Sequence, residues 1–366
     1  MSVSRLSTIL AACSSNDGMK PAAGLPVISA ADQAISIVPL ARALAGTAGS
    51  SDREWILWAY SVVASGLIDV PTLIAMWHEI VAYDEVLAAY LASPIQVPER
   101  TVLVSGSGKE TFKTFNVSTA AAILAVAAGA RVVKGVSASV SATSGSADIL
   151  ACLGVSVLTS PAAITEAMSR LGLAFIPYAA FCPRYAARYD GRFRALSPMS
   201  FVMPAATLAV SADGFIHGLA HPGVAASAAA IAAARPDLVA GQVVTTLVSA
   251  GERVDEIVGR GSASVASVFR GAVTVSEMTF PRPGARWRSA VGHRSSHWAN
   301  ARAVADSLSP GGHPDARDLV ERNATAILAI SAPEMRPDQA RHDIRRARES
   351  GAAIRLLRRL ASASGE

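Results

Sequence analysis

The chain is poor in cysteine, in aromatic residues and in long apolar runs. Its three cysteines, Cys13, Cys152 and Cys182, form no closely spaced pair, which argues against a disulfide framework or a cysteine zinc site and fits a reducing cytoplasm. Aromatic side chains make up only 5% of the 366 residues, too few for a surface that stacks single-stranded nucleic acid. No apolar run reaches the length of a membrane-spanning helix, so we expect a cytoplasmic protein without a membrane partner.

Positive charge is concentrated at the C-terminal end. The formal net charge is +5, and residues 336–366 hold eight arginines against four acids. Such a segment can contact nucleic acid or an acidic membrane. It also has the apolar spacing of one amphipathic helix that docks on the protein body through Ile344, Ile354, Leu357 and Leu360. We favour the docked helix and keep nucleic-acid binding as an alternative.

Strand and helix patterns alternate between residues 100 and 330, which predicts a doubly wound α/β sheet. Residues 31–98 show only helical patterns and predict a small helical domain. Part of the irregular basic segment 178–204 is a candidate for a further piece of this domain. Residues 1–30, rich in Ser, Ala, Gly and Pro, predict a flexible arm. The remainder, residues 99–366, forms the predicted α/β domain.

Two loops of small residues each follow a predicted strand and precede a predicted helix. The strand at 101–105 ends in Gly106-Ser-Gly108, and hydroxyl-rich residues 116–119 begin a helix. The strand at 131–134 is followed by a serine-rich loop at 141–146 and a second helix. Backbone N–H groups at such helix starts favour an anion, and glycines allow its close approach.

The first of these loops is not a standard nucleotide motif. Leu103 and Glu110 stand where a Walker A loop needs a glycine and a Ser or Thr, and the third glycine of a Rossmann fingerprint is missing. The loop therefore predicts an anion site without naming the ligand.

Lysines and paired acids supply the charges that a phosphorylated ligand needs. Only four lysines stand against 29 arginines, and three of the four, Lys109, Lys113 and Lys134, flank the two loops. A lysine ammonium suits phosphate oxygens. Asp255 and Glu256 follow another predicted strand, where open α/β sheets bind ligands. Carboxylates together with substrate phosphates hold Mg²⁺, so the sequence favours a pyrophosphate-bearing substrate with magnesium.

Three ordered motifs resemble those of the anthranilate phosphoribosyltransferase family. Residues 106–119, GSGKETFKTFNVST, resemble its Gly-Thr-Gly-Gly-Asp-Gly…Phe-Asn-Ile-Ser-Thr signature. Residues 134–148, KGVSASVSATSGSAD, resemble its Lys-His-Gly-Asn-Arg-Ser-Val-Ser-Ser-Lys-Ser-Gly-Ser-Ala-Asp, and 254–257, VDEI, its Leu-Asp-Glu-Ile magnesium motif. The resemblance implies a helical domain hinged to an α/β domain of the nucleoside phosphorylase/phosphoribosyltransferase type, usually as a homodimer. It also implies a cleft for phosphoribosyl pyrophosphate and two Mg²⁺ ions.

The resemblance further implies site residues, matched position by position. Those for phosphoribosyl pyrophosphate are Gly106, Ser107, Gly108, Lys109, Asn116, Ser118, Thr119, Lys134 and Ser146. Those for the metal are Ser118, Asp255 and Glu256. Those for the acceptor are Gly135, Ser137 and Arg192, and no catalytic residue is expected beyond the donor and metal site.

The acceptor half departs from the family pattern. Lys109 and Glu110 replace a glycine and an aspartate of the first loop, and residues 135–138, GVSA, replace the family's His-Gly-Asn-Arg run. We therefore expect a phosphoribosyltransferase of specialised metabolism whose aromatic or heteroaromatic acceptor is not anthranilate. The alternatives are a true anthranilate phosphoribosyltransferase of tryptophan biosynthesis, a non-catalytic relative that binds nucleic acid, and a nucleoside phosphorylase.

Overall fold

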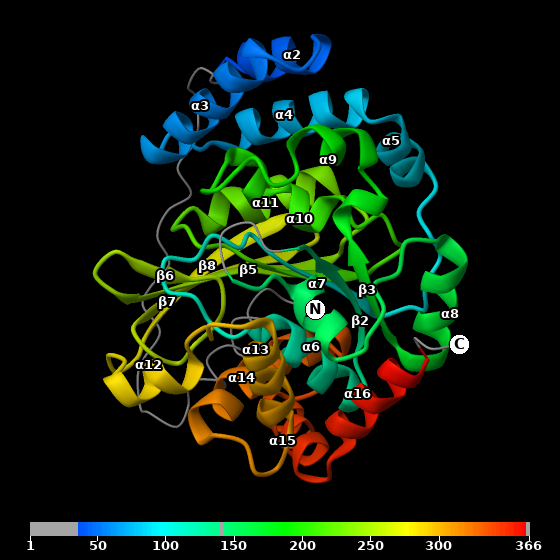
Figure 1. The fold of residues 1–366 in the computed structure, drawn as a ribbon, viewed down its shortest axis with the longest axis vertical. Helices are drawn as coiled ribbons and strands as arrows, with labels where there is room; N and C mark the ends of the chain where they lie inside the picture. The colour runs from blue at the N-terminus through cyan, green and yellow to red at the C-terminus, as the bar shows by residue number, and fades with distance from the viewer. Residues whose placement is uncertain (1–35, 139–142, 364–366) are drawn as a thin grey trace.

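A mixed sheet runs through the middle of the molecule in the computed structural model, which describes residues 36–138 and 143–363 (Figure 1). The arm expected at 1–30 lies outside this range. The strand order is β3-β2-β1-β4-β5-β7-β8, with β6 paired to β5. The strands are β1 Thr101–Gly106, β2 Arg131–Val136, β3 Leu173–Pro177, β4 Gly214–Gly218, β5 Ala240–Ser249, β6 Glu252–Val254, β7 Ser262–Phe269 and β8 Ala272–Thr279.

Strands β1 to β5 pair in parallel, whereas β6, β7 and β8 pair antiparallel at one side of the sheet. Strands β7 and β8 form a hairpin that turns at Arg270 and Gly271, with φ angles of 49° and 79°. Two positive φ angles are typical of the tight turn that matches strand twist. The doubly wound α/β prediction is confirmed.

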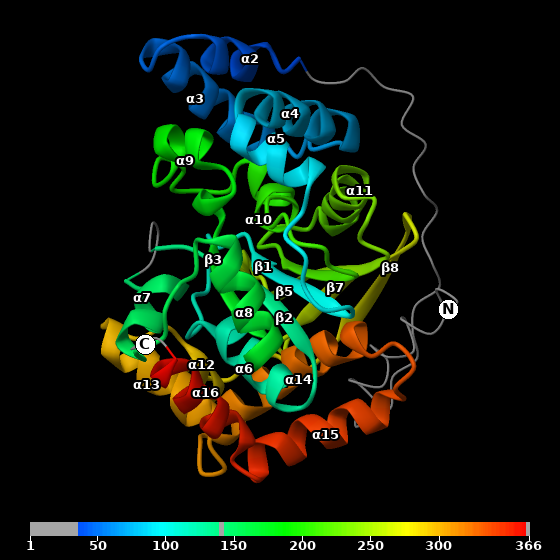
Figure 2. The same cartoon turned by 90° about the vertical axis from the view of Figure 1, so that its right-hand side faces the viewer.

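Alternating side chains on the strands feed two separate hydrophobic cores. Leu103 of β1 belongs to the core on one face, and its neighbours Val102 and Val104 belong to the core on the other. Successive strand side chains point to opposite faces, and both faces are covered by helices (Figures 1 and 2). The apolar side chains of the strands are therefore buried on both faces of the sheet, in a three-layer structure of helices, sheet and helices.

The N-terminal helices lie on one side of the sheet together with a group of helices from the middle of the chain (Figure 2). Pro at the first or second helical position and Asp69 at an N-cap help to define where α2 and α4 begin. The helices on this side are α2 Val38–Ala45, α3 Ser50–Ala64, α4 Val70–Tyr83, α5 Glu85–Ala92, α9 Pro183–Tyr189, α10 Met203–Ala206 and α11 Val224–Ala234.

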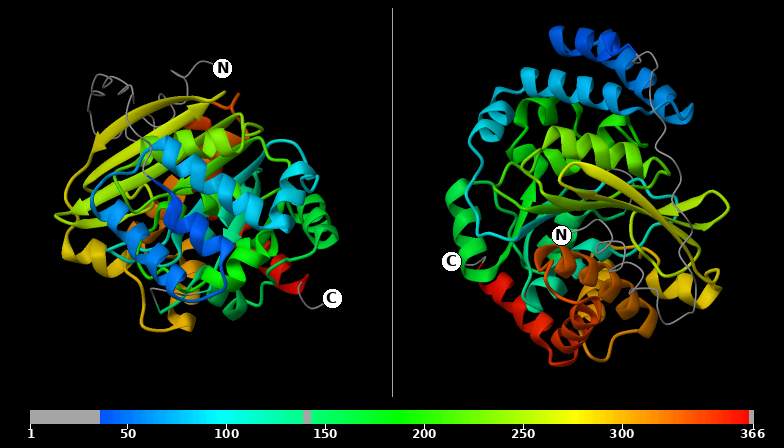
Figure 3. Two further views of the ribbon diagram at one scale, coloured as in Figure 1. Left: turned by 90° about the horizontal axis from the view of Figure 1, so that it is seen from above. Right: turned by 180° about the vertical axis from the view of Figure 1, so that it is seen from behind.

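The opposite side is covered chiefly by C-terminal helices, which the view from behind places far from the blue N-terminal helices (Figure 3). The alanine-rich α6 Val117–Ala127 packs against α14 Pro314–Ser331, and its small side chains let the two helices approach closely. The other helices on this side are α7 Ser146–Cys152, α12 Ala285–Val291, α13 His297–Leu308, α15 Pro337–Glu349 and α16 Ala352–Ser362. Helix α8 Pro161–Leu171 instead places its buried Ile164 and Met168 in the core that contains Leu103.

Two sequence predictions need correction. Residues 178–204 are not simply irregular, because they contain α9, α10 and the 3₁₀ turns Tyr178–Ala180 and Pro198–Phe201. These pieces are too short to show a helical period. The basic C-terminal segment is two helices rather than one, because Gly351 adopts a left-handed φ of 73° between α15 and α16. Ile344, Leu357 and Leu360 are nevertheless buried as expected.

The arginines of the basic segment are partly neutralised by nearby acids. Arg348 pairs with Glu321 of α14, and Arg341 and Arg346 pair with Asp338 and Asp343 within α15. No helix within 36–138 or 143–363 is long and apolar enough to cross a membrane.

Candidate functional site

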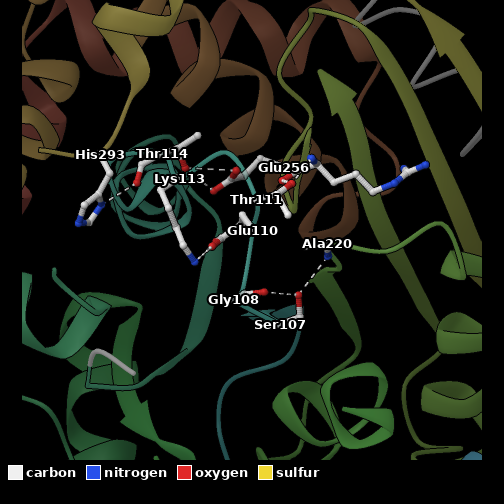
Figure 4. Close-up of polar contacts among 10 residues, drawn as sticks. Ser107, Gly108, Glu110, Thr111, Lys113, Thr114, Ala220, Glu256 and His293 are labelled. Carbon is white, nitrogen blue, oxygen red and sulfur yellow. Dashed lines mark hydrogen bonds and ion pairs between the residues drawn. The ribbon is translucent and has the colours of Figure 1, made fainter. Parts of the chain in front are cut away.

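The first glycine loop leaves β1 and is fixed by the ends of two other strands. The Ser107 N–H donates to the Gly218 carbonyl at 2.8 Å, and the Ala220 N–H donates to Ser107 Oγ at 3.1 Å (Figure 4). Further along the loop, Thr111 Oγ1 accepts from the Arg253 N–H at 2.7 Å. The loop is therefore tied both to β4 and to β6, which leads directly into the acidic pair.

Glycine is required where this loop passes the acidic pair. A Cβ at Gly106 would lie 2.8 Å from an Asp255 carboxylate oxygen, and a Cβ at Gly218 would lie 2.2 Å from the Asp255 carbonyl oxygen. Both approaches are closer than a side chain allows. The two glycines thus bring the loop backbone and the Asp255 carboxylate together.

Three carboxylates gather at this point, from Glu110, Asp255 and Glu256. Burial, followed by the charges of Glu110 and Glu256, raises the pKa of Asp255. Burial and the Glu110 charge raise the pKa of Glu256 to about 8, against a hydrogen bond from Thr114 Oγ1 at 3.2 Å. Buried carboxylates that repel one another in this way are a donor set that a divalent cation would stabilise.

Lysines face the carboxylates across the same space. Lys113 Nζ lies 2.9 Å from Glu110, and the Lys113 charge overcomes the effect of burial so that the pKa of Glu110 is lowered (Figure 4). Lys134 is 3% exposed, and burial lowers its pKa to about 8 although Asp255 and Glu256 oppose the shift. Lys109 has a φ of 66°, in the left-handed region that favours glycine.

The second loop is held by a hydrogen bond to α13 and by hydrogen bonds among residues at its own two ends. Ser144 Oγ lies 2.8 Å from His297 Nδ1, and Ser146 Oγ accepts from the Ser137 N–H at 3.2 Å. The Asp148 carboxylate closes the start of α7 by accepting from the Gly145 N–H at 2.7 Å. Residues 141 and 142 of the predicted loop lie outside the described range.

The two loops and the acidic pair line a single cleft at the carboxyl edge of the parallel strands. Of the residues predicted from the sequence, the cleft brings together Gly106, Ser107, Gly108, Lys109, Asn116, Ser118, Lys134, Gly135, Ser137, Ser146, Asp255 and Glu256. It does not include Thr119, which is fully buried, or Arg192, which lies 3.9 Å from Asp52.

Several lining residues were not predicted from the sequence. His293 follows α12, and its Nδ1 donates to the Thr114 carbonyl oxygen at 3.1 Å (Figure 4). Glu110, Thr114 and Ser144 also line the cleft, as does Lys113, which the sequence analysis named only as a lysine that flanks the loops. The composition of the first loop is a usable signal for Glu110 and Thr114, whereas nothing in the local sequence around His293 indicates the contact.

A second, aromatic pocket adjoins the cleft and shares Gly106, Ser107, Lys109, Gly135 and Ser137 with it. Its remaining walls come mainly from residues 178–204, and they include Tyr178, Tyr185, Tyr189, Asp190 and Phe193. Half of the six tyrosines of the chain fall within residues 178–189, a concentration that could have been read as a signal for this pocket.

Within the described part of the chain, no group of three His, Cys, Asp or Glu side chains, Glu110, Asp255 and Glu256 included, is arranged to hold a metal ion by itself. Magnesium does not require such a cage, because it is commonly held by one or two carboxylates together with phosphate oxygens and water. Backbone N–H groups, lysines and paired carboxylates in one cleft can therefore hold a phosphorylated ligand with its cation. The fold and the cleft define an α/β protein with a charged site at the carboxyl edge of its sheet.

Comparison with known proteins places the chain in a family. A family model described as "Glycosyl transferase family, a/b domain" matches residues 99–354. A protein from Nocardioides sp. named anthranilate phosphoribosyltransferase is 33% identical over 281 residues, which cover 75% of this chain and 80% of the relative. One of the same name from Methylibium petroleiphilum is 32% identical over 306 residues, covering 77% and 81%. The chain belongs to this glycosyl transferase family, with the anthranilate phosphoribosyltransferases, and is a phosphoribosyltransferase by class.

Solved structures agree on the fold. The anthranilate phosphoribosyltransferase of Saccharomyces cerevisiae in complex with PRPP and Mg superposes with a TM-score of 0.69 at 16% identity, over 89% of this chain and 90% of that one. The enzyme of Thermus thermophilus gives a TM-score of 0.64 at 21% identity, over 90% and 99%. At such identities the likeness establishes the architecture, and it confirms the helical segment joined to an α/β domain that the motifs predicted.

Proposed function

We propose that this chain transfers phosphoribose from phosphoribosyl pyrophosphate to an aromatic acceptor with the help of Mg²⁺. The observation that supports the proposal is the approach of Gly106 to Asp255, which places an anion-binding loop and a buried acidic pair on one cleft. The bond from ribose C1 to the pyrophosphate oxygen breaks, a bond from C1 to the acceptor atom forms, and the acceptor loses a proton.

On the donor side, each group of residues has a separate task. Ser107, Gly108 and Lys109 would bind the pyrophosphate, and Lys134 would bind a phosphate from β2. Asn116, Ser118, Thr119 and Ser146 would complete the phosphate contacts. The side chain of Thr119 is buried, so this residue would contact the phosphate through its backbone N–H group or after a movement of its side chain. These fixed positive groups would stabilise the negative charge that develops on the departing pyrophosphate, so catalysis would depend on positioning and electrostatics.

Asp255 and Glu256 are the proposed metal ligands, with Ser118 as a hydroxyl ligand and two ions as the expected number. Bound Mg²⁺ would neutralise the charge that develops on the departing pyrophosphate. The raised pKa values of Asp255 and Glu256 support this assignment, because a nearby cation favours their ionised forms. The homodimer implied by the family stays a prediction, which sedimentation analysis would test.

For the acceptor, the comparisons favour anthranilate over the different aromatic acceptor expected from the sequence, because the relatives matched over most of their length carry the name anthranilate phosphoribosyltransferase. One observation supports the different acceptor as a second candidate. Arg192, the predicted acceptor-binding cation, points to Asp52 and does not line the aromatic pocket.

Pyrophosphate release from phosphoribosyl pyrophosphate and the fluorescence of anthranilate test the two parts separately. We expect Asp255→Asn with Glu256→Gln to abolish pyrophosphate release, while Glu277→Gln, an exposed carboxylate on β8, leaves it unchanged. Full activity of the double variant would refute the metal assignment. Loss of anthranilate fluorescence on incubation with the donor would establish anthranilate as the acceptor, and persistence of the fluorescence while other aromatic acceptors react would favour the second candidate.

A further inference from the structure

The aromatic pocket next to the donor cleft has a charge pattern that limits what it can bind. Of its described lining residues, Lys109 and Asp190 carry charge, and none of the described arginines lines it. Lys109 also lines the donor cleft, where a pyrophosphate would compete for its ammonium group. The Asp190 charge acts on Lys109, so only when Lys109 is bound to pyrophosphate is the Asp190 carboxylate the charge that faces an acceptor.

The arginines nearest in sequence are engaged elsewhere. Arg188 binds Asp52 with an Nε–Oδ1 distance of 2.9 Å, and Arg192 lies 3.9 Å from the same carboxylate. Arg184 donates to the Tyr83 carbonyl at 2.8 Å. Asp52, which is 1% exposed, thus draws positive charge toward the N-terminal helices and away from the pocket.

Asp190 occupies a position that does not favour a carboxylate for stability alone. It is the C-cap of α9, where the helix dipole disfavours negative charge. Tyr178 forms a hydrogen bond with the Asp190 carboxylate. Burial raises the pKa of Tyr178, and the Asp190 charge and this hydrogen bond raise it further. The carboxylate is solvent-exposed and lines the pocket, so a ligand can reach it.

A second hydrogen-bond acceptor in the pocket is the Ser105 hydroxyl oxygen. His217 Nε2 lies 3.0 Å from the Ser200 carbonyl, so this nitrogen carries the proton of the neutral ring. His217 Nδ1 must then accept from Ser105, whose Oγ lies 3.0 Å away. With its proton donated to the histidine, Ser105 Oγ offers only lone pairs to the pocket, which it lines while 4% exposed.

Resting on the second candidate of the proposed function, an acceptor other than anthranilate, we propose that this pocket selects an aromatic acceptor that has no carboxylate and presents N–H or O–H donors to Asp190 and Ser105. The pocket volume of about 180 Å³ exceeds the ~150 Å³ of a cavity that holds benzene. A substituted single ring is therefore of suitable size. A carboxylate on that ring would meet Asp190 as a like charge, which disfavours binding.

The test compares anthranilate with 2-aminobenzamide, which has the same ring and amine but a neutral amide in place of the carboxylate. Affinities are measured by calorimetry on the full chain, with Mg²⁺ and inorganic pyrophosphate present and again without them. We expect 2-aminobenzamide to bind about tenfold more tightly than anthranilate. Equal affinities, tighter anthranilate binding, or binding of neither compound would overturn the inference.

Two variants assign the selectivity to the pocket. Asp190→Asn should narrow the preference for the amide by about fivefold, because it removes the like charge, whereas Asp338→Asn, an exposed acid on α15, should leave it unchanged. An unchanged preference in Asp190→Asn would overturn the role of this carboxylate. Donor binding is measured in parallel, so failure to bind phosphoribosyl pyrophosphate would refute the proposed function, whereas the affinity ratio measured with inorganic pyrophosphate and its change in Asp190→Asn decide this inference.

Discussion

The buried histidine beneath the aromatic pocket predicts a specific acid sensitivity. His217 is fully buried, hydrogen-bonded to Ser105 and Ser200, and burial lowers its pKa to about 4. In the unfolded chain the same side chain has a pKa of about 6.5. Lowering the pH therefore protonates His217 in the unfolded state before it does so in the folded state.

The size and sign of the effect follow from this difference in pKa. Between pH 6.5 and 4 the unfolded state binds more protons, so the free energy of unfolding falls as the pH falls. The loss from His217 reaches about 2 kcal/mol by pH 5 and about 3 kcal/mol near pH 4. Above pH 7 both states are neutral at this position, and its titration contributes no pH dependence there.

Urea unfolding followed by circular dichroism at a series of pH values measures this loss. The His217→Gln variant, which keeps a polar side chain without a titrating ring, is compared with the wild type. Carboxylates and other histidines titrate in both proteins, so the difference between the two pH profiles isolates His217. We expect the wild type to lose about 2 kcal/mol more than the variant between pH 7 and pH 5. Parallel profiles would refute the conclusion that His217 is held neutral by burial.

Three further substitutions test other parts of the site. Gly218→Ala places a Cβ 2.2 Å from the Asp255 carbonyl oxygen. Because this clash displaces Asp255, Mg²⁺-dependent donor binding should weaken by about tenfold in calorimetry, and an unchanged affinity would contradict the assignment of Asp255 as a metal ligand. Lys109→Gly should raise the free energy of unfolding by about 1 kcal/mol, because glycine tolerates the φ of 66°, while donor affinity falls; lower stability would contradict the strain. Asp52→Asn should cost about 3 kcal/mol in urea unfolding by leaving Arg188 without its buried partner, and a negligible loss would show that solvent screens the pair.

The part of the cleft formed by the first glycine loop and the acidic pair could be predicted because its residues lie in continuous motifs. Residues 106–119 contain the loop, the start of α6 and two of the lysines, so one stretch of sequence carries most of its chemistry. The acidic pair at 255 and 256 was recognisable because it follows a strand of the same sheet. Carboxyl ends of parallel strands meet at one edge, so sequence order was enough to bring these residues together.

The aromatic pocket could not be predicted in the same way. Ser105 and His217 are 112 residues apart and meet because β1 and β4 pair in parallel with this register. The direction of Arg192 depends on Asp52, which comes from α3. Short helices between 178 and 204 have no period long enough to detect, although they form most of the aromatic wall.

The α/β class, the strands at 101–105 and 131–134, and most residues that line the charged cleft follow from the sequence alone. These properties are local, because alternation, helical period and glycine spacing are written in neighbouring residues. Which charges line the aromatic pocket depends on the tertiary structure. It turned the nearby arginines toward Asp52 and left Asp190 and Ser105 facing the pocket, since the direction of a long side chain depends on partners contributed by distant segments.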